Sequence, residues 1–288
     1  MKRTGMIAGG TRASDFPTCR YGTSPLSFRG PRRQLGGEYL SCIGGTETYG
    51  RYVAQPFPDI LEQDMDLRCV NFGYVNAGID VFLGDATVIE TCAHSAVTVI
   101  QVLGAHNLTN RFYTVHPRRN DRFVKASAML RALYPEIDFT HFHFTRHMLD
   151  CLIETSPSRF ELVLSELQRL WIAKMRLLTD RVGRKAVLVW IADRGPGGSE
   201  STVWGGAPLF VTRAMLDAVE GRLIGLVEVV ETPQERAAAL GDKVFGPGEQ
   251  QVALQVPGPR THMRAADAIA DAIRARRAAS GECHRRIG

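Results

Sequence analysis

The sequence of 288 residues lacks both a long apolar run and any paired-cysteine motif. A membrane-spanning helix needs about 18 or more consecutive apolar residues, so we expect no membrane span. The opening Met-Lys-Arg is not followed by the apolar stretch of a secretion signal. The six cysteines are scattered without a CxxC pair, so disulfides and a cysteine-bound zinc ion are not expected. These absences predict a cytoplasmic protein.

A strong positive charge is also missing from the body of the chain. The whole sequence carries a net charge of +5. The positive excess lies at the ends, because residues 1–33 carry +6, residues 257–288 carry +4 and residues 34–256 carry −5. A nucleic-acid-binding surface needs concentrated positive charge, so we expect no nucleic-acid partner for the body. Weak binding through the two basic ends stays open.

Apolar segments alternate with helical patterns from residue 39 onward. The run at 96–103 is too apolar to be half exposed and indicates a buried parallel strand, with a second buried strand at 185–191 and a third apolar strand at 223–230. Because crossover helices force parallel pairing, the alternation predicts an α/β fold, a three-layer αβα sandwich. Two shorter strands are expected at 39–43 and 68–72, and helices at 56–63, 121–133, 143–153, 157–182, 212–219 and 261–276.

The ends of the chain differ in composition from its centre. Residues 1–37 are rich in Gly, Ser, Pro and Arg and lack periodicity, so we expect a segment that is flexible or wrapped on the body. Residues 38–276 are expected to form a single α/β domain. Residues 277–288 are expected to be a disordered basic tail.

Ligands of parallel α/β sheets bind beyond the carboxyl ends of the strands, so the loops that follow the strands matter most. The loop after the first predicted strand, Gly44–Gly50, reads GGTETYG. It matches neither a Walker motif nor a GxGxxG fingerprint. Thr46 can present its hydroxyl there as a nucleophile or an anion ligand, or it can simply cap the next helix.

The loop after residue 103 is rich in hydrogen-bond donors. Its segment 111–122 carries four arginines against one aspartate. Arginine recognises carboxylate, sulfate and phosphate groups through paired hydrogen bonds. We expect this loop to bind an anionic substrate, unless its arginines pair with acids of the body. The expected substrate-binding residues in it are His106, Arg111, His116, Arg118 and Arg119.

Two further histidine patterns carry weaker signals. His141, His143 and His147 form HxHxxxH, which could hold a metal on a helix. Neighbouring phenylalanines favour packing instead, and we expect neither a metal nor another cofactor. His262 opens the last predicted helix, where the helix dipole disfavours its protonated form and suits a neutral general base. The alternative is an ordinary histidine in a capping turn.

In chain order, four segments resemble the sequence blocks of the SGNH (GDSL-type) hydrolase superfamily. The matching positions are Gly44-Gly45-Thr46, Asn76-Ala77-Gly78, Gly104-Ala105-His106-Asn107 and Pro259-Arg260-Thr261-His262. The resemblance covers roughly residues 39–275 and implies a flavodoxin-like parallel sheet. The stretches GGTETYGRYVAQPFPDIL, VNAGIDVFL, NRFYTVHPRRNDRF and HFTRHML are also similar to a bacterial SGNH-like family with no assigned activity.

The resemblance implies roles in acyl transfer for the matching residues. Thr46 takes the position of the nucleophile and His262 that of the general base. The backbone N–H groups of Thr46 and Gly78, with the amide of Asn107, would stabilise an oxyanion. Two further residues would contact the substrate, Glu47 and Asn76.

Three positions depart from the superfamily pattern. Thr46 replaces the usual serine and is a more hindered nucleophile. His106 stands where the family has an asparagine, with Asn107 one place later. Pro259 replaces the aspartate that orients the base, and loss of this group costs about 10⁴ in rate in the serine-protease template.

Two functions follow from these observations. The first is an ester hydrolase or acyltransferase that acts on a polar, anionic glycan or a related small molecule. The second is a binding protein that keeps the crevice of the hydrolase scaffold but has lost the acid, and recognises a sulfated, phosphorylated or uronic ligand. Whether the chain is an enzyme, and how it oligomerises, does not follow from the sequence.

Overall fold

The computed structural model describes residues 16–197 and 206–285, with the side chains of the last helix described up to residue 279. The described part of the predicted N-terminal segment is wrapped on the body. Its strands β1 (Thr18–Cys19) and β2 (Phe28–Arg29) pair antiparallel. The ring of Phe28 packs edge-on against Phe72, which fixes this segment to the sheet. Residues 1–15 of the predicted segment lie outside the described residues.

The centre of the fold is a five-stranded parallel sheet. The spatial order of its strands is β4-β3-β5-β8-β9, and every pairing is parallel. This is the flavodoxin-like order, and the predicted three-layer sandwich is confirmed. Each strand lies within two residues of its predicted range. The strands are β3 (Leu40–Gly44), β4 (Cys69–Gly73), β5 (Val97–Gln101), β8 (Ala186–Ala192) and β9 (Leu223–Val230).

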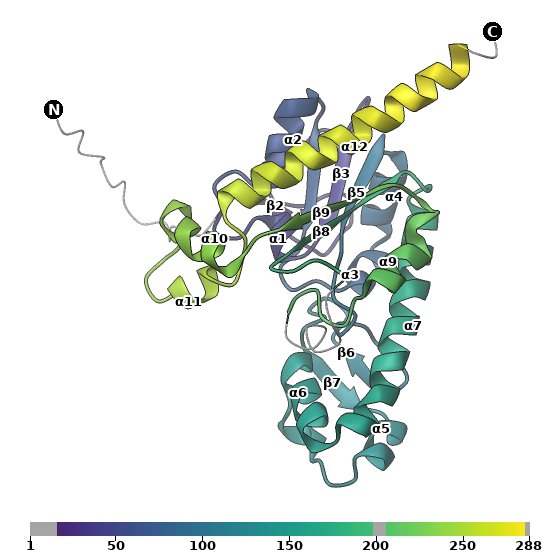
Figure 1. The fold of residues 1–288 in the computed structure, drawn as a ribbon, viewed down its shortest axis with the longest axis vertical. Helices are drawn as coiled ribbons and strands as arrows, with labels where there is room; N and C mark the ends of the chain where they lie inside the picture. The colour runs from purple at the N-terminus through teal and green to yellow at the C-terminus, as the bar shows by residue number, and fades with distance from the viewer. Residues whose placement is uncertain (1–15, 198–205, 286–288) are drawn as a thin grey trace, which may run out of the picture.

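Helices cover both faces of this sheet (Figure 1). One face carries α2 (Phe57–Met65) and α12 (Pro259–Arg285), which pack on each other and on the strands. The other face carries α7 (Pro157–Arg181), whose predicted apolar stripe is buried in the larger part of the core. With it lie α3 (Ile79–Leu83), α4 (Ala86–His94) and α9 (Arg213–Glu220).

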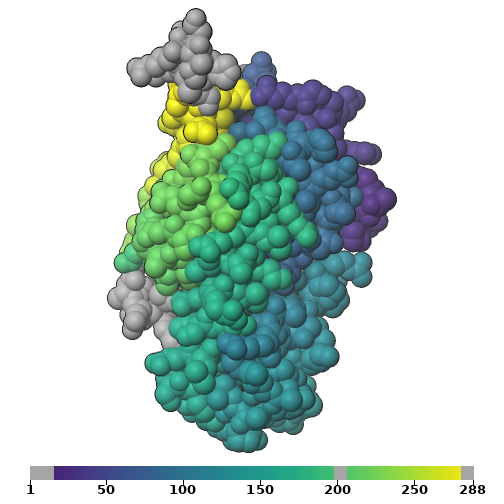
Figure 2. Space-filling view, turned by 90° about the vertical axis from the view of Figure 1, so that its right-hand side faces the viewer, coloured from purple at the N-terminus to yellow at the C-terminus, as the bar shows by residue number. Residues whose placement is uncertain are grey.

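A small lobe is inserted between β5 and α7, and its teal residues form the lower end of the molecule in Figures 1 and 2. The prediction of a helix over 121–133 is wrong for the first half of this range. There the chain forms a strand, because Phe123 and Ala126 are buried in a hairpin, and the helix begins only after the N-cap Ser127. The lobe comprises β6 (Tyr113–Val115), β7 (Phe123–Ala126), α5 (Ala128–Leu133), η1 (Phe139–His141) and α6 (Thr145–Thr155).

A second insertion follows β9 and leads into the last helix. It comprises α10 (Pro233–Ala238), η2 (Ala239–Asp242) and α11 (Gln250–Ala253). Helix α12 then runs to Arg285 and does not end at residue 276, so most of the predicted disordered tail is helical. Arg277 on this extension pairs with Glu38 at 2.5 Å. None of the described helices is long and apolar enough to cross a membrane.

Candidate functional site

The loop after β3 is held by one side chain of the neighbouring strand. Gln101, the last residue of β5, accepts at Oε1 from the backbone N–H groups of Gly45 (2.9 Å) and Thr48 (3.1 Å). Its Nε2 donates to the carboxylate of Glu47 at 2.6 Å. The predicted turn is a short helix, α1 (Thr46–Tyr49), fixed to β5 in this way. Thr46 and Glu47 are therefore held at the carboxyl edge of the sheet.

A cavity of about 340 Å³, which we call the edge cavity, opens beside this loop. Its volume lies at the lower end of the range of small-molecule sites, about 300–1,000 Å³. Apolar residues from the ends of β5 and β8 and from the lobe form much of its wall. The polar side chains that line it are Thr46, Glu47, Asn76, Gln101, His106, Asn107, Asp121 and Arg146.

Three of these polar side chains form a chain of hydrogen bonds. The Thr46 hydroxyl donates to Oδ1 of Asn76 at 3.4 Å and accepts the backbone N–H of Asn76 at 3.2 Å. The Asn76 Nδ2 donates to the carboxylate of Asp121 at 3.3 Å. Asn76 adopts a left-handed backbone conformation (φ +58°), which asparagine tolerates better than most residues. The Thr46 hydroxyl is thus in contact with the amide groups of Asn76. An amide is not a base and cannot take the proton of the hydroxyl.

His106 and Asn107 line the cavity, and each has one buried polar atom without a hydrogen-bond partner. Asn107 is 6% exposed, and neither its Oδ1 nor the Nδ1 of His106 has a hydrogen-bond partner. Burial, together with the positive charge of Arg146, lowers the pKa of His106 to about 3. The imidazole is therefore neutral at physiological pH. Both atoms are shielded from solvent, so a ligand in the cavity can bind them once these side chains turn toward it.

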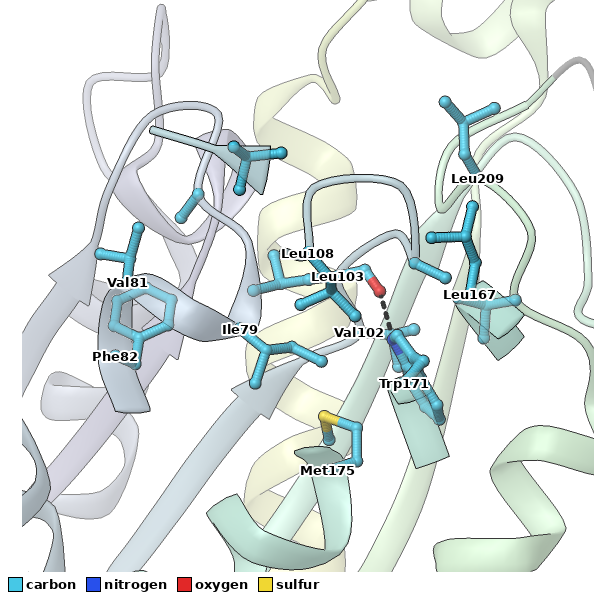
Figure 3. Packing of buried hydrophobic residues seen from close by; sticks show 14 of the residues in the cluster. Ile79, Val81, Phe82, Val102, Leu103, Leu108, Leu167, Trp171, Met175 and Leu209 are labelled. Atoms are coloured by element: carbon cyan, nitrogen blue, oxygen red, sulfur yellow. Dashed lines mark hydrogen bonds between the residues drawn. The ribbon is translucent and has the colours of Figure 1, made fainter. Parts of the chain in front are cut away.

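The segment that carries these two residues rests on a rigid support. Trp171 of α7 is fully buried, and its Nε1 donates to the carbonyl oxygen of Leu103 at 2.7 Å (Figure 3). The Tyr113 hydroxyl donates to the carbonyl oxygen of His106 at 2.6 Å. These two bonds tie the loop after β5 to the helix below it and to the lobe. Sites supported in this way hold their polar groups in a fixed geometry.

The structure does not bring His262 to Thr46. The ring of His262 is 2% exposed, stacks on Phe57 of α2 and does not line the edge cavity. Its Nδ1 accepts the backbone N–H of Phe57 at 3.1 Å. A backbone N–H only donates, so the proton of the neutral ring is on Nε2, and the ring has no free basic nitrogen. The pairing of nucleophile and general base implied by the SGNH resemblance is not realised.

The backbone of Gly78 is also engaged elsewhere. Its N–H donates to Oδ1 of the buried Asn120 at 3.0 Å, so it is not free for an oxyanion. Only glycine lets this backbone approach the loop of Asn107 so closely, because a Cβ at position 78 would lie 2.2 Å from the carbonyl oxygen of Asn107. Gly78 therefore positions the loop of Asn107, which is a structural role.

The predicted arginine cluster is divided among different surroundings. Arg111 pairs with Glu166 at 3.0 Å, the alternative that the sequence left open. His116 accepts at Nδ1 from the backbone N–H groups of Arg118 and Arg119, both at 3.2 Å, and so shapes the turn. The side chain of Arg118 lines a separate groove beside Asp80. The other two arginines of the segment, Arg119 and Arg122, line a space next to the edge cavity.

This neighbouring space, which we call the second hollow, has a volume of about 360 Å³. It shares Asn76 and Asp121 with the edge cavity. The guanidinium of Arg122 lies over the ring of Phe144, 4.0 Å from its centre. The residues that line the second hollow are Ser27, Tyr49, Tyr74, Val75, Asn76, Arg119, Asp121 and Arg122.

The sequence did not single out Gln101, Asp121 or Arg146 for the site. Gln101 carried a usable signal, because a polar residue that ends an apolar strand is positioned at the ligand edge of the sheet. Asp121 was the one acid in the arginine-rich segment. Arg146 lies on α6 in the inserted lobe, and nothing local in the sequence places that lobe over the sheet edge.

The HxHxxxH motif lies in the lobe. His141 and His143 are exposed, and the ring of His147 packs edge-on against Phe142, with ring centres 5.1 Å apart. Within residues 16–197 and 206–285, no three His, Cys, Asp or Glu side chains are grouped so that they could hold a metal ion.

A family model described as a domain of unknown function (DUF6473) matches residues 5–277 of this sequence. The chain belongs to this family. No curated protein matches this DUF6473 chain.

Two solved structures are similar to the chain at 10% sequence identity. One is a carbohydrate esterase family 2 enzyme with a carbohydrate-binding domain from Corynascus thermopiles (Myceliophthora fergusii), with a TM-score of 0.43 over 86% of this chain and 69% of that chain. The other is the lipase Lip_vut3 from a goat rumen metagenome, with a TM-score of 0.39 over 83% of this chain and 97% of that chain. Likeness at this level says nothing about the substrate of this protein.

Proposed function

We propose that this protein binds a polar, anionic small molecule in the edge cavity, without covalent chemistry, on an SGNH-like scaffold that lacks a working base. The observation that carries this proposal is the pair of atoms without partners, His106 Nδ1 and Asn107 Oδ1, on residues that line the cavity. Buried polar groups are hydrogen-bonded in the great majority of cases. Two adjacent exceptions on residues that line a cavity support a ligand that completes their hydrogen bonds when the side chains turn toward it.

The charges of the cavity support a ligand with both an anionic group and hydroxyl groups. Arg146 is exposed, and within the described residues it has no carboxylate partner. It can bind a carboxylate, sulfate or phosphate through paired hydrogen bonds. Glu47 and Asp121 can accept hydrogen bonds from hydroxyls. Acidic sugars combine these two kinds of group.

Ester cleavage is the second candidate function. Thr46 follows β3 at the position of the superfamily nucleophile, and it shares the edge cavity with the neutral imidazole of His106. A general base works best with a pKa near the operating pH, whereas the pKa of His106 is lowered to about 3. The contacts of Thr46 with Asn76 likewise leave its hydroxyl without a base. Binding is therefore better supported than turnover.

The test is a glycan array of uronic, sulfated, phosphorylated and neutral saccharides, followed by titration calorimetry on the saccharides that bind. We expect binding to acidic saccharides and none to their neutral counterparts. Arg146→Gln and Asn107→Ala should each weaken binding about tenfold, the effect of one charge-assisted or buried hydrogen bond. The matched control is Arg118→Gln, in the separate groove, which should bind as the natural protein does. Equal binding of neutral and acidic saccharides would refute the proposal.

A further inference from the structure

We infer that the ligand extends from the edge cavity past Asn76 into the second hollow, so that the protein recognises an acidic oligosaccharide of at least two units. This inference rests on the proposed function, because it extends the same site. It adds the length of the ligand and the position of a second anionic group.

The two spaces are built as neighbours with a common wall. Asn76 and Asp121 line both of them. Their volumes, about 340 and 360 Å³, are similar, and each lies near the lower limit for a small-molecule site, about 300 Å³. Phe144 lines the edge cavity, and its ring carries the guanidinium of Arg122, which lines the second hollow. One ligand can therefore contact both spaces through consecutive units.

The second hollow has positive charge that the protein does not neutralise by ion pairing. Among the described residues, neither Arg119 nor Arg122 has a carboxylate within 4.0 Å, although the chain forms many other ion pairs. The carboxylate of Asp121 lines the same hollow, where it accepts a hydrogen bond from Asn76. Two arginines against one aspartate leave a positive site for an anionic group.

The remaining lining of the second hollow suits a sugar unit better than a free inorganic anion. Tyr49 and Tyr74 contribute aromatic side chains, which combine an apolar ring surface with a polar hydroxyl. Asp121, on the common wall, is a hydrogen-bond acceptor, and ligand hydroxyls are the donors that match it. A bare phosphate or sulfate would leave these acceptor and apolar groups unused.

The inference is tested with acidic saccharides of one, two and four units and with inorganic phosphate, by titration calorimetry on the full chain. The variants are the double substitution Arg119→Gln/Arg122→Gln and the control Arg118→Gln. Arg118 and Arg119 are adjacent, exposed and of equal charge, but they line different spaces. Circular dichroism checks that each variant is folded.

We expect a two-unit acidic saccharide to bind at least tenfold more tightly than its single unit, as one further charge-assisted contact allows. The double variant should lose this advantage and keep the affinity for the single unit, while Arg118→Gln should change neither. Equal affinity for one and two units, or an advantage that survives in the double variant, would overturn the inference and leave the proposed function standing. Binding of phosphate as tight as that of the two-unit saccharide would also overturn it. Failure to bind any acidic saccharide would overturn both.

Discussion

The imidazole of His262 accepts the backbone N–H of Phe57 at 3.1 Å, where the start of α12 meets the start of α2. This bond uses the nitrogen that would face an orienting acid in a catalytic triad and leaves the ring proton on Nε2. The histidine that the SGNH resemblance puts at the position of the base therefore joins two helices.

A first prediction concerns the stability of the fold below neutral pH. Burial lowers the pKa of both His262 and His106 to about 3, below the value of about 6.5 in an unfolded chain. The unfolded state then binds protons that the folded state does not. The free energy of unfolding should thus be highest above pH 6.5 and fall toward pH 5, by up to about 1.4 kcal/mol per pH unit for each histidine.

Urea unfolding at pH 5.0, 6.0 and 7.5 measures this slope. His262→Gln keeps an acceptor for Phe57 but cannot titrate, so it should reduce the slope by about half. A variant with the same slope as the natural protein would show that His262 is not buried as a neutral ring.

A second prediction concerns the buried carboxylate that follows β9. Glu231 is 2% exposed and accepts from the backbone N–H of Gly258 (2.9 Å) and the hydroxyl of Thr261 (2.6 Å), while its other oxygen pairs with Arg236 at 2.9 Å. Glu231→Ala leaves these groups without a partner and should lower the free energy of unfolding by about 3–5 kcal/mol. Glu231→Gln retains an acceptor and should cost clearly less. Chemical denaturation compares the two, and equal losses would contradict the hydrogen-bonding role.

A third prediction tests the close approach at Gly78. Gly78→Ala places a methyl group 2.2 Å from the carbonyl oxygen of Asn107, so we expect a loss of about 1–3 kcal/mol in the free energy of unfolding. Gly221→Ala is the matched control, because a Cβ there has no atom within 4 Å. Thermal unfolding of both variants should separate them clearly. A Gly78→Ala protein as stable as the control would disprove the contact.

A fourth prediction separates stability from binding at Asn107. The Oδ1 of Asn107 has no partner in the protein, so Asn107→Ala removes no internal hydrogen bond at that atom. We expect the free energy of unfolding to fall by no more than about 1 kcal/mol, the typical cost of a point substitution. Ligand binding should weaken at the same time. A strong loss of stability would instead mean that Asn107 serves the fold.

The sequence was informative where one local property decides the structure. The apolar, β-branched run of Val97–Gln101 and the periodic stripe around Trp171 gave a strand and a helix almost to the residue. It failed at Phe123, where burial in the lobe overrides a helical pattern, and at Arg285, where the last helix continues through a polar segment.

The site was predictable only in part, for a related reason. Thr46, Asn76, His106 and Asn107 follow strands, and parallel strands bring their carboxyl ends together, so the structure does collect them in one cavity. The partner of His262 is a backbone group distant in the chain, which no local pattern reports. Each arginine of the loop either forms an ion pair, lines the separate groove or lines the second hollow, and which of these it does likewise depends on the tertiary fold.

The central claim, binding without turnover, is tested most directly by mass spectrometry of the protein mixed with an acetylated uronic oligosaccharide, under native and then denaturing conditions. The account expects a complex under native conditions that dissociates on denaturation, with the mass of the saccharide unchanged. An acyl group that remains on the Thr46 peptide after denaturation, or release of acetate that Thr46→Ala abolishes, would contradict it.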